Sequence, residues 1–561
     1  LKALSFDEDI CRYYPYGALL SQVLGLTTVD SEGQSGLESR YEDVLRGTEG
    51  SYLRQVDARN RQLDGTEGWY IPSQQGCGLV LTIDAEIQEM VEKAMRECIE
   101  VNQAQSVICL VSDVKTGAIL AMCMNPCYDP NDPPRNDAET LTEQMRLTAI
   151  SDVYEPGSTF KILTAASALD SGVTTPQDSF YCSAKITVDG DTIRCWGRPH
   201  GAETMADGLK NSCNPVFVEL ALRMGTDTFY RYLTAFGLGK KTGIDLPGES
   251  PGILITSRNV KRVDLARIGF GQSVALTPIQ MMMAANSVIN GGKLMKPYIV
   301  SEIQTPDGET LERFHPTVMA APIRPETSDT MRLLLERVVS EGGGKNAAIA
   351  GYRIGGKTGT AQVYKNGRVV RDTHIGSFYG FAPVNDPQVS ILVIVKEADV
   401  PIDYGGTTAA PFARQIMQEM LPYLGIDPEN DEKDEEIEVP ALKGLTIGDA
   451  KRKLSQVGLE SVTDGANTVV LDQLPPAGAK LVKGGHVMLY TAGSEELTPE
   501  ELVCVPDLTG LGDVDCARLV RQRGLMMSMT GQGLCIEQSP AAGEYVQPGT
   551  TIFLLMAGDD E

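Results

Sequence analysis

The chain has 561 residues, 42% of them hydrophobic and 22% charged, which is the composition of a globular protein rather than a disordered or fibrous one. At roughly 150 residues per domain, this length suggests about three to four domains. Acidic residues outnumber basic ones by 75 to 49, so the formal net charge is −26. That balance argues against nucleic acid or anionic lipid as a partner, because both require a basic surface. With four histidines in the whole chain, we expect no metal and no cofactor.

Residues 1–77 are polar and rich in glycine, and they show no clear helix or strand pattern. The chain begins at Leu1 without a charged and then apolar signal segment. No apolar run reaches the roughly 18 residues of a membrane span. We therefore expect residues 1–77 to be the end of a truncated domain.

Residues 78–425 form the main body, in which helix and strand patterns alternate. Asp84 is the predicted N-cap of a helix, because apolar residues follow it at helical spacing. These residues are Ile87, Val91, Ala94 and Cys98. The further elements predicted are strands at 107–111, 119–124 and 390–396 and helices at 280–290 and 411–424. Helices interleaved with a mostly antiparallel sheet indicate a multidomain α/β protein of the α+β type.

A short motif that can carry nucleophilic chemistry begins at Ser158. Lys161 follows three residues later, on the same face of a predicted helix that is apolar nearly all round and therefore buried. A serine hydroxyl is a weak nucleophile until a neighbouring base activates it. Burial and the positive end of the helix dipole both favour the neutral amine that such a base requires. A capped helix without any chemistry explains the same spacing, so the motif alone leaves both interpretations open.

A hydroxyl and an amide follow at Ser212 and Asn214. Two residues apart on a loop, they can face one cleft, where the hydroxyl relays a proton and the amide holds a substrate amide. Asn214 also precedes a proline, which is typical of an ordinary turn, so this second motif is weaker than the first.

A third motif contains Lys357 and Thr358, and residues 351–358 satisfy the phosphate-loop pattern. A phosphate loop needs a helix to begin at its lysine and threonine, whereas a predicted β-hairpin with an Asn-Gly turn at 366–367 follows here. We therefore reject nucleotide binding. Glycines along a strand leave room for another backbone. An extended peptide could pair there, with Lys357, Thr358 and Thr360 binding its terminal carboxylate.

An internal repeat ends the chain. Gln473 of the first unit, for example, recurs as Gln538 of the second, 65 residues later. Each unit is predicted to form a short helix, with Thr446 as its N-cap in the first, and then an alternating strand. Neither has a cluster suited to chemistry, so we interpret both as spacer or binding modules. The block 427–438 before them has eight acidic residues and one lysine, which predicts a solvated linker.

The three motifs occur in the order typical of serine penicillin-recognising enzymes, which is Ser-x-x-Lys, Ser-x-Asn and Lys-Thr-Gly. Their residues here are Ser158, Lys161, Ser212, Asn214, Lys357, Thr358 and Gly359. Further segments resemble class B penicillin-binding proteins, at 12–17, 36–38, 81–84, 269–272 and 404–406. The two repeats resemble PASTA modules. The resemblance covers essentially the whole chain.

This resemblance implies a peptidoglycan D,D-transpeptidase whose fold has helices flanking an antiparallel sheet. Ser158 would attack the penultimate D-Ala carbonyl of a stem peptide and form an acyl-enzyme. Lys161 would take the hydroxyl proton, and Ser212 would relay it to the leaving amine. An amine from a second stem peptide would then accept the acyl group, and β-lactams would acylate the same serine.

The resemblance also implies how the substrate is held. Asn214 would bind the amide of the acyl chain. Lys357, Thr358, Gly359 and Thr360 would form the substrate-binding strand that holds the terminal carboxylate. The backbone N–H groups of Thr360 and of the nucleophile would form the oxyanion hole.

Partners, location and domains are implied in the same way. The expected partners are stem peptides with a D-Ala-D-Ala donor and an amine acceptor, β-lactams and a membrane glycosyltransferase. We expect the protein at the outer face of a bacterial cytoplasmic membrane, anchored by an N-terminal segment absent from this chain. The expected domains are a partial pedestal or dimerisation domain at 1–77, a transpeptidase domain at 78–425, an acidic linker at 426–438 and PASTA repeats at 439–494 and 503–558.

Two other functions stay open. A β-lactamase or β-lactam sensor of the same superfamily carries the same motifs, although no Glu-x-x-x-Asn-like segment to activate water stands out between Ser212 and Lys357. An inactive scaffold that binds the cell wall is the second alternative. The complete set of motif residues argues against it.

Cys182 and Cys195 flank a predicted β-hairpin. In the expected register Cys182 faces residue 197 and Cys195 faces residue 184, so a disulfide between the two requires some register slip or a bulge. Sporulation-type penicillin-binding proteins look similar here, while two unpaired thiols are the alternative. A zinc site with His200 is not expected, because no fourth ligand is apparent.

Overall fold

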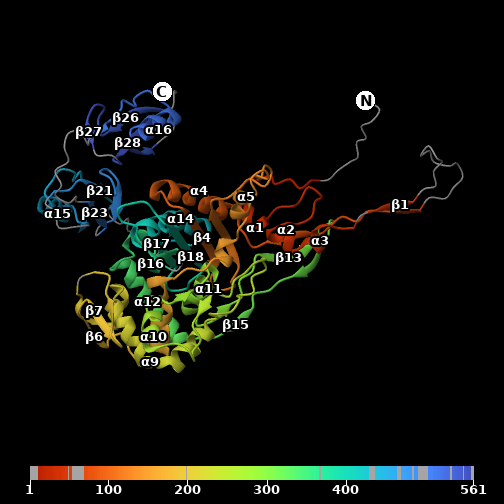
Figure 1. The fold of residues 1–561 in the computed structure, drawn as a ribbon, viewed down its shortest axis with the longest axis horizontal. Coiled ribbons are helices and arrows are strands. Elements are labelled where there is room, and N and C mark those ends of the chain that lie inside the picture. Colours follow the sequence, from red (N-terminus) through yellow and green to blue (C-terminus); the bar gives the residue numbers. More distant parts are fainter. Residues whose placement is uncertain are drawn as a thin grey trace. The chain divides into compact units, whose positions relative to one another are not determined.

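The computed structural model describes most of the chain, which forms two compact units at residues 1–435 and 436–561 (Figure 1). The residues described are 11–48, 50–53, 69–197, 199–365, 368–428, 436–463, 469–482, 485–490, 503–530, 533–546 and 549–557. None of the helices in these ranges combines the length and the apolar character needed to cross a bilayer.

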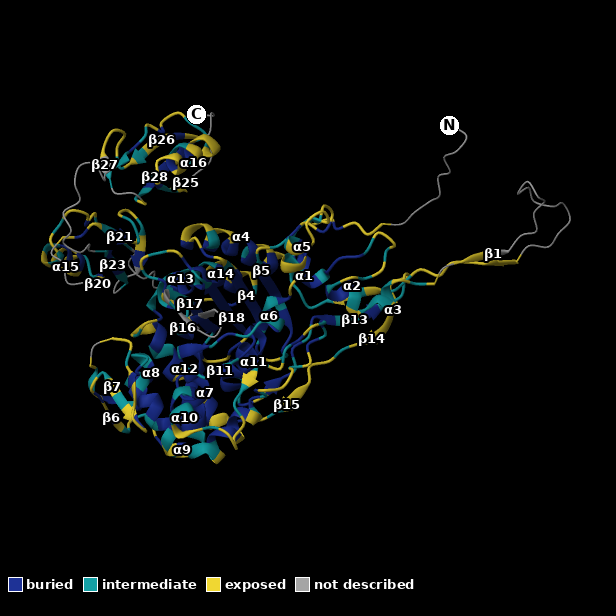
Figure 2. Ribbon diagram, viewed as in Figure 1, coloured by how far each residue is buried: buried dark blue, intermediate teal, exposed yellow. Residues whose placement is uncertain are grey.

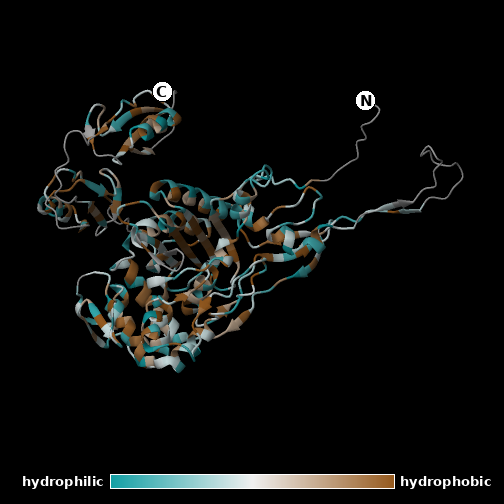
Figure 3. Ribbon diagram, in the orientation of Figure 1, coloured by the Kyte–Doolittle hydropathy of each residue, from teal (hydrophilic) through white to brown (hydrophobic). Residues whose placement is uncertain are grey.

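A five-stranded antiparallel sheet lies at the centre of the first unit, in the order β16-β17-β18-β4-β5. Its strands are β4 (Ser106–Asp113), β5 (Ile119–Asn125), β16 (Gly355–Lys365), β17 (Arg368–Ala382) and β18 (Val389–Lys396), which confirms the strands predicted in this region. Along β18, Leu392 and Ile394 belong to one hydrophobic core, whereas Ile391 and Val393 belong to another. Both faces of the sheet are therefore buried, so its central strands are continuous apolar runs (Figures 2 and 3).

Helices cover both faces of this sheet (Figure 1). One core contains α4 (Ala85–Asn102) and α14 (Ala410–Tyr423), and the other contains α7 (Lys161–Asp170), α9 (Asn214–Ala235), α11 (Pro278–Ile289) and α12 (Pro325–Ser340). The shorter helices are α5 (Ala138–Gln144), α6 (Thr148–Ser151), α8 (Met205–Lys210), α10 (Arg262–Ile268), α13 (Gly405–Thr408) and the 3₁₀ turns η1 (Gly157–Phe160) and η2 (Lys345–Ala347). The predicted N-cap of α4 is confirmed, because the Asp84 carboxylate accepts hydrogen bonds from the backbone N–H groups of Glu86 and Ile87 at 3.0 and 3.1 Å.

Short strands and helices surround this body. A three-stranded sheet has the order β14-β13-β3, with β3 (Gly78–Leu81), β13 (Val300–Gln304) and β14 (Thr310–Arg313). The two-stranded pairs are β1 (Ser51–Leu53) with β2 (Trp69–Ile71), β6 (Ser179–Cys182) with β9 (Gly201–Thr204), β7 (Lys185–Val188) with β8 (Asp191–Arg194), β10 (Ile253–Leu254) with β11 (Val274–Ala275), and β12 (Leu294–Met295) with β15 (Val318–Ala320).

The N-terminal part, which showed no pattern in the sequence, contains short helices that contact the main body. They are α1 (Ser21–Leu24), α2 (Gly36–Arg40) and α3 (Glu42–Leu45). Leu20, just before α1, donates its backbone N–H to the buried Glu92 carboxylate of α4 at 2.8 Å. A buried hydrogen bond to a charged group contributes more to stability than a surface ion pair. This bond therefore helps to hold the N-terminal helices against α4.

The second unit contains the predicted repeat twice, each time with its own hydrophobic core. The first has α15 (Ile447–Gln456), the pair β19 (Glu436–Glu438) with β22 (Lys480–Val482), and the sheet β20-β23-β21 with β20 (Glu460–Thr463), β21 (Asp472–Leu474) and β23 (His486–Tyr490). The second has α16 (Asp513–Gln522), the pair β24 (Val503–Cys504) with β27 (Tyr545–Val546), and the sheet β25-β28-β26 with β25 (Met526–Thr530), β26 (Leu534–Ser539) and β28 (Thr551–Ala557). The predicted N-cap Thr446 is confirmed, since its hydroxyl accepts the Asp449 N–H at 3.1 Å. Within the predicted acidic linker, residues 429–435 lie outside the described residues.

One glutamine holds the same turn in each repeat. Gln473 accepts the Leu442 N–H at 2.7 Å and donates to the carbonyls of Pro440 and Pro475 at 3.1 and 3.2 Å. Gln538 makes the three equivalent bonds in the second repeat, at 2.7, 3.0 and 3.2 Å. The recurrence of this glutamine in the sequence therefore has a structural cause.

We expect Gln473→Leu to destabilise the first repeat by about 1–3 kcal/mol, because it leaves a buried N–H group without an acceptor. Hydrogen exchange of the full chain should become faster in peptides from 436–490 and stay unchanged in those from 503–557. Gln456→Leu, at an exposed position of α15, is the control. Unchanged exchange across 436–490 in Gln473→Leu would contradict this role.

Gly405 of α13 packs directly on β16 and β17. A Cβ atom at this position would come within 2.2 Å of the Ser377 carbonyl oxygen and 2.3 Å of the Gly359 carbonyl oxygen. We expect Gly405→Ala to reduce the free energy of unfolding by about 1–3 kcal/mol, as overpacking does. Pulsed hydrogen exchange of peptides from residues 373–382 of β17, along a series of urea concentrations, reports this change. Gly78→Ala is the control, since a Cβ there meets nothing within 4 Å, and equal midpoints for the two variants would contradict the expectation.

Candidate active site

The candidate nucleophile and its neighbouring lysine lie where a tight turn leads into α7. Ser158 is half-buried in η1, and Lys161 is the fully buried first residue of α7. The predicted α-helical turn around Ser158 is therefore a 3₁₀ turn instead. The reason is Gly157, whose φ of +53° bends the chain just before it. A Cβ on Gly157 would come within 2.6 Å of the Thr360 carbonyl oxygen, so this turn lies directly against β16.

The Lys161 side chain is held by the loop that carries the second motif. Its Nζ donates to the carbonyl oxygen of Ser212 and to Asn214 Oδ1, both at 2.7 Å, and to Ser212 Oγ at 3.2 Å. Burial lowers the pKa of Lys161 to about 7. The nearby Cys213, Cys195 and Glu203 raise this pKa, but by less than burial lowers it. A substantial fraction of this amine is therefore neutral near pH 7, as a base requires.

Ser212 lies between two buried lysines. Its Oγ accepts hydrogen bonds from Lys161 Nζ at 3.2 Å and from Lys357 Nζ at 3.1 Å. Its φ is +54°, a conformation that is strained for serine. Burial, and then repulsion by Lys161, hold the pKa of Lys357 well below its usual range. The structure thus brings together residues that are distant in the sequence.

The predicted carboxylate-binding residues lie on β16, the edge strand of the described sheet. Alternation along the strand places Lys357 and Gly359 on one face and Thr358 and Thr360 on the other. Lys357 is fully buried, whereas both threonines are half-exposed. Residues 357–360 are therefore extended strand, which confirms that they are not a phosphate loop. The predicted turn at 366–367 lies outside the described residues.

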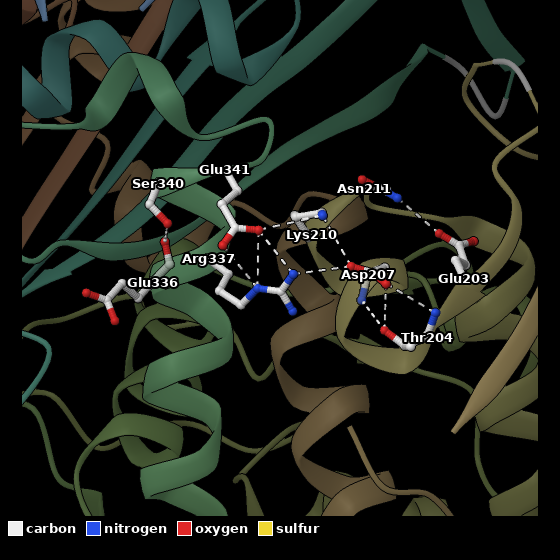
Figure 4. Close-up of polar contacts among 9 residues, drawn as sticks. All are labelled: Glu203, Thr204, Asp207, Lys210, Asn211, Glu336, Arg337, Ser340 and Glu341. Atoms are coloured by element: carbon white, nitrogen blue, oxygen red, sulfur yellow. Dashed lines mark hydrogen bonds and ion pairs between the residues drawn. The ribbon is translucent and has the colours of Figure 1, made fainter. Parts of the chain in front are cut away.

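A charged network joins α8, which leads to Ser212, with the end of α12, which precedes β16 (Figure 4). Arg337 pairs with Asp207 at 3.3 Å and Glu341 at 3.1 Å, and Lys210 pairs with the same two carboxylates at 3.2 and 3.7 Å. Burial raises the pKa of Asp207, but hydrogen bonds from Thr204 and Lys210 outweigh this effect and lower the pKa to about 2. Such partly exposed pairs each stabilise by only about 0–1 kcal/mol. The network therefore matters mainly for orienting α8 against α12.

The two cysteines of the predicted disulfide are free thiols in the structure. Cys195 faces residue 184 as predicted, because its N–H donates to the Ala184 carbonyl at 2.7 Å. The predicted register is wrong for Cys182, which pairs with Gly201 of β9 rather than facing residue 197. Ala184, with a φ of +69°, turns the chain between β6 and β7 and so ends the hairpin early. The disulfide itself stays a prediction.

Two side chains beside this hairpin were not singled out from the sequence. Cys213, between the two polar residues of the second motif, hydrogen-bonds Cys195 and thereby lowers the pKa of Cys195 to about 5, while the same bond raises the pKa of Cys213. Glu203 is 7% exposed and lies near the Cys213 thiol. The third cysteine within this short span was a usable signal for Cys213. Nothing in the local pattern indicated that Glu203 is buried.

Three families match the chain. The transpeptidase domain of penicillin-binding proteins matches residues 107–418, and the penicillin-binding protein dimerisation domain matches residues 1–81. The PASTA domain matches residues 437–493 and 503–558. The first match covers more than half of the chain, including all three motifs.

Individual proteins agree with these matches. Stage V sporulation protein D of Bacillus subtilis (strain 168) is 38% identical over 507 residues, or 88% of this chain and 78% of that protein. Peptidoglycan D,D-transpeptidase FtsI of Escherichia coli (strain K12) is 30% identical over 430 residues, or 76% of this chain and 70% of that protein. The crystal structure of penicillin-binding protein 3 from Mycobacterium tuberculosis, complexed with ampicillin, is similar with a TM-score of 0.67 and 28% identity, covering 75% of this chain and 91% of that one. The chain therefore belongs to the penicillin-binding protein transpeptidases, with a dimerisation domain and PASTA repeats beside the transpeptidase domain.

Proposed function

We propose that this protein is a serine D,D-transpeptidase that cross-links peptidoglycan stem peptides through an acyl-enzyme on Ser158 and is inhibited when β-lactams acylate that residue. One observation carries the proposal. The Ser212 hydroxyl accepts hydrogen bonds from both buried lysines, at 3.2 Å from Lys161 and 3.1 Å from Lys357. Such a connected set of groups can take a proton from a nucleophile and return it to a leaving group.

Lys161 is the proposed base, and its hydrogen bonds suit both of its protonation states. As an ammonium ion it donates three N–H groups, which matches its three contacts. The carbonyl oxygen of Ser212 and Asn214 Oδ1, both at 2.7 Å, can only accept, so they take the two N–H groups of the neutral amine. The longer contact with Ser212 Oγ can reverse its direction, because a hydroxyl also donates. When Ser212 does not donate to it, the lone pair of the neutral amine is free to receive the Ser158 proton.

The first step forms the acyl-enzyme. The Ser158 hydroxyl proton moves to Lys161 Nζ while Ser158 Oγ bonds to the carbonyl carbon of the penultimate D-Ala. The negative charge on the carbonyl oxygen would be stabilised by the backbone N–H groups of Ser158 and Thr360, a role supported by the close approach of Gly157 in η1 to Thr360 in β16. Collapse breaks the bond to the terminal D-Ala, whose nitrogen receives the proton from Lys161 through Ser212. An amine of a second stem peptide then attacks the ester carbonyl and loses a proton to Lys161. The new amide bond forms, the ester bond breaks, and Lys161 returns the proton to Ser158 Oγ.

The substrate is held on the edge of the sheet. A stem peptide that pairs along β16 would place its terminal carboxylate near the half-exposed hydroxyls of Thr358 and Thr360. The missing side chain of Gly359 lets the strand pack closely against Thr159 and Ser377. Lys357 would act from the other face through the hydrogen bond that it donates to Ser212 Oγ. Asn214 would bind the amide of the acyl chain. A β-lactam presents a similar carboxylate and amide to the same groups.

The remaining assignments belong to the same proposal. We assign a pedestal domain to 1–77, the transpeptidase to 78–425, a linker to 426–438 and PASTA repeats to 439–494 and 503–558. Because peptidoglycan is assembled outside the cytoplasmic membrane, we place the enzyme at its outer face, held by an N-terminal anchor. A membrane glycosyltransferase would supply the glycan strands.

Ser158→Ala should abolish covalent labelling of the full chain by a fluorescent penicillin, because it removes the attacking oxygen. Mass spectrometry of the labelled wild-type protein should locate the acyl group on Ser158. Ser171→Ala, at the C-cap of α7 and outside the motifs, should label normally. Undiminished labelling of Ser158→Ala would disprove the assignment. Loss of the label from the wild-type protein within seconds, rather than its persistence for many minutes, would favour a β-lactamase instead.

The rate of acylation should increase with pH and level off above the pKa of Lys161. Lys161 is protonated below about 7 and neutral above it, and only the neutral amine accepts the Ser158 proton. Stopped-flow measurement of penicillin acylation should therefore give a midpoint near 7, and Lys161→Ala should reduce the rate by about 10²–10⁴-fold. Lys396→Arg, at another lysine whose pKa is lowered by burial, should leave the midpoint unchanged. A midpoint near 10, the pKa of a free lysine, would contradict the assignment.

A further inference from the structure

Four side chains with metal-binding atoms converge on the loop of Ser212. They are Cys182 at the end of β6, Cys195 after β8, His200 before β9 and Cys213 at the N-cap of α9. One ligand atom from each lies within 4.8 Å of all the others. Among the residues that the structure describes, this is the single group of three or more histidine, cysteine or acidic side chains close enough to hold a metal ion.

We propose that these four side chains bind one Zn²⁺ ion, which holds the loop between α8 and α9 in place. Three thiolates and one imidazole are a ligand set of structural zinc sites, which are tetrahedral and closed to substrate. Thiolates also select zinc over magnesium and calcium, which prefer oxygen ligands. The sequence shows no fourth ligand to accompany Cys182, Cys195 and His200, whereas the structure supplies one in Cys213.

The distances suit this geometry. Zinc bonds of about 2.3 Å to sulfur and about 2.0 Å to nitrogen place tetrahedral ligand atoms roughly 3.5–3.8 Å apart. Cys195 Sγ and His200 Nδ1 are 3.8 Å apart. The widest spacing, at most 4.8 Å, closes with an inward movement of about 1 Å. Cys182 and Cys213 are buried, and Cys195 and His200 are half-buried, so an ion could enter yet be shielded once bound.

Glu203 provides a second, independent observation. Its Oε1 is buried and has no hydrogen-bond partner among the described residues, while it lies 3.8 Å from His200 Nδ1. Figure 4 shows its other oxygen held by Asn211, at 3.2 Å. A buried carboxylate oxygen without a donor is unfavourable. When one ring nitrogen of a histidine binds metal, the other carries a proton and usually donates to a carboxylate, and Glu203 is the buried carboxylate beside His200.

The proposed ion explains how the strained loop is held. Cys213 lies between Ser212, with its φ of +54°, and Asn214, whose side chain also donates to the Arg194 carbonyl at 3.0 Å. Bonds from one ion to Cys213 and to the segments around β6, β8 and β9 would hold this conformation independently of the lysines. Only this positioning effect rests on the proposed function, whereas the metal site itself does not.

Zinc binding and the predicted disulfide exclude each other. A disulfide between any two of Cys182, Cys195 and Cys213 would remove two of the three thiolates, and the remaining side chains could not complete a tetrahedral site. The redox state of the thiols is therefore part of the test.

The metal content of the full chain tests the site directly. The protein is produced in medium containing Zn²⁺, purified with a reductant and without chelators, and analysed by inductively coupled plasma mass spectrometry. We expect one zinc ion per chain, lost in Cys195→Ser and Cys213→Ser and retained in Cys127→Ser, which removes a half-buried thiol outside the cluster. Wild-type protein without zinc, equal loss in Cys127→Ser, or a disulfide among the three cysteines in peptide maps would overturn the proposal.

A cobalt titration of the wild-type chain tests the site without any cysteine variant, and so does not depend on whether the variants fold. Co²⁺ added to metal-free protein should produce the intense thiolate-to-cobalt and tetrahedral d–d absorption bands, and Zn²⁺ should abolish them. Absence of both bands would also overturn the site.

The positioning effect is measured separately. Removing zinc should slow penicillin labelling of Ser158 by about 10²-fold, the cost of displacing a positioning group by about 1 Å. Zinc binding with an unchanged labelling rate would refute the positioning role. If zinc-loaded protein is not labelled at Ser158 at all, the proposed function fails, while the metal content still decides the site.

Discussion

Two buried lysines share one serine hydroxyl, and the arrangement of the catalytic unit depends on that contact. Placing one ammonium group away from water is unfavourable, and placing two side by side is more so. The protein meets this constraint by lowering the pKa of both Lys161 and Lys357, so that a base exists near neutral pH without help from a histidine. The contact holds only if α7, the loop of Ser212 and β16 keep fixed positions. Much of the surrounding structure keeps α7, the loop of Ser212 and β16 in these positions.

Packing and charge position these three segments in different ways. The central sheet is buried on both faces, so β16 extends from a rigid body although it is an edge strand. The turn of Ser158 approaches β16 so closely that only glycine fits at position 157. The loop of Ser212 is oriented by the charged network between α8 and α12, and Cys213 of the cysteine-rich group lies on the same loop. Close packing therefore sets the position of the nucleophile, whereas polar contacts set the position of the proton relay.

The two C-terminal repeats show a different use of polar groups. Gln473 and Gln538 each connect an N–H group and two proline carbonyls, so the same buried turn forms in both. In so small a core, one side chain that satisfies several backbone groups replaces apolar contacts that the domain cannot supply. These glutamine hydrogen bonds stabilise the turn in each repeat. Their role is structural, unlike that of the hydrogen bonds between the buried lysines and Ser212.

The sequence by itself determined the order and type of the main elements, the three motifs, the repeat and the N-caps at Asp84 and Thr446. These features depend on hydrophobic period, capping and glycine placement within a few residues, which a sequence displays directly. Only the tertiary structure decided that Ser212 lies between two lysines, that Cys182 pairs with Gly201, and that Cys213 and Glu203 join the cysteine group. The physical reason is that these contacts join different strands, helices and loops. Which of them meet depends on how the sheet and helices pack, and no local pattern records that.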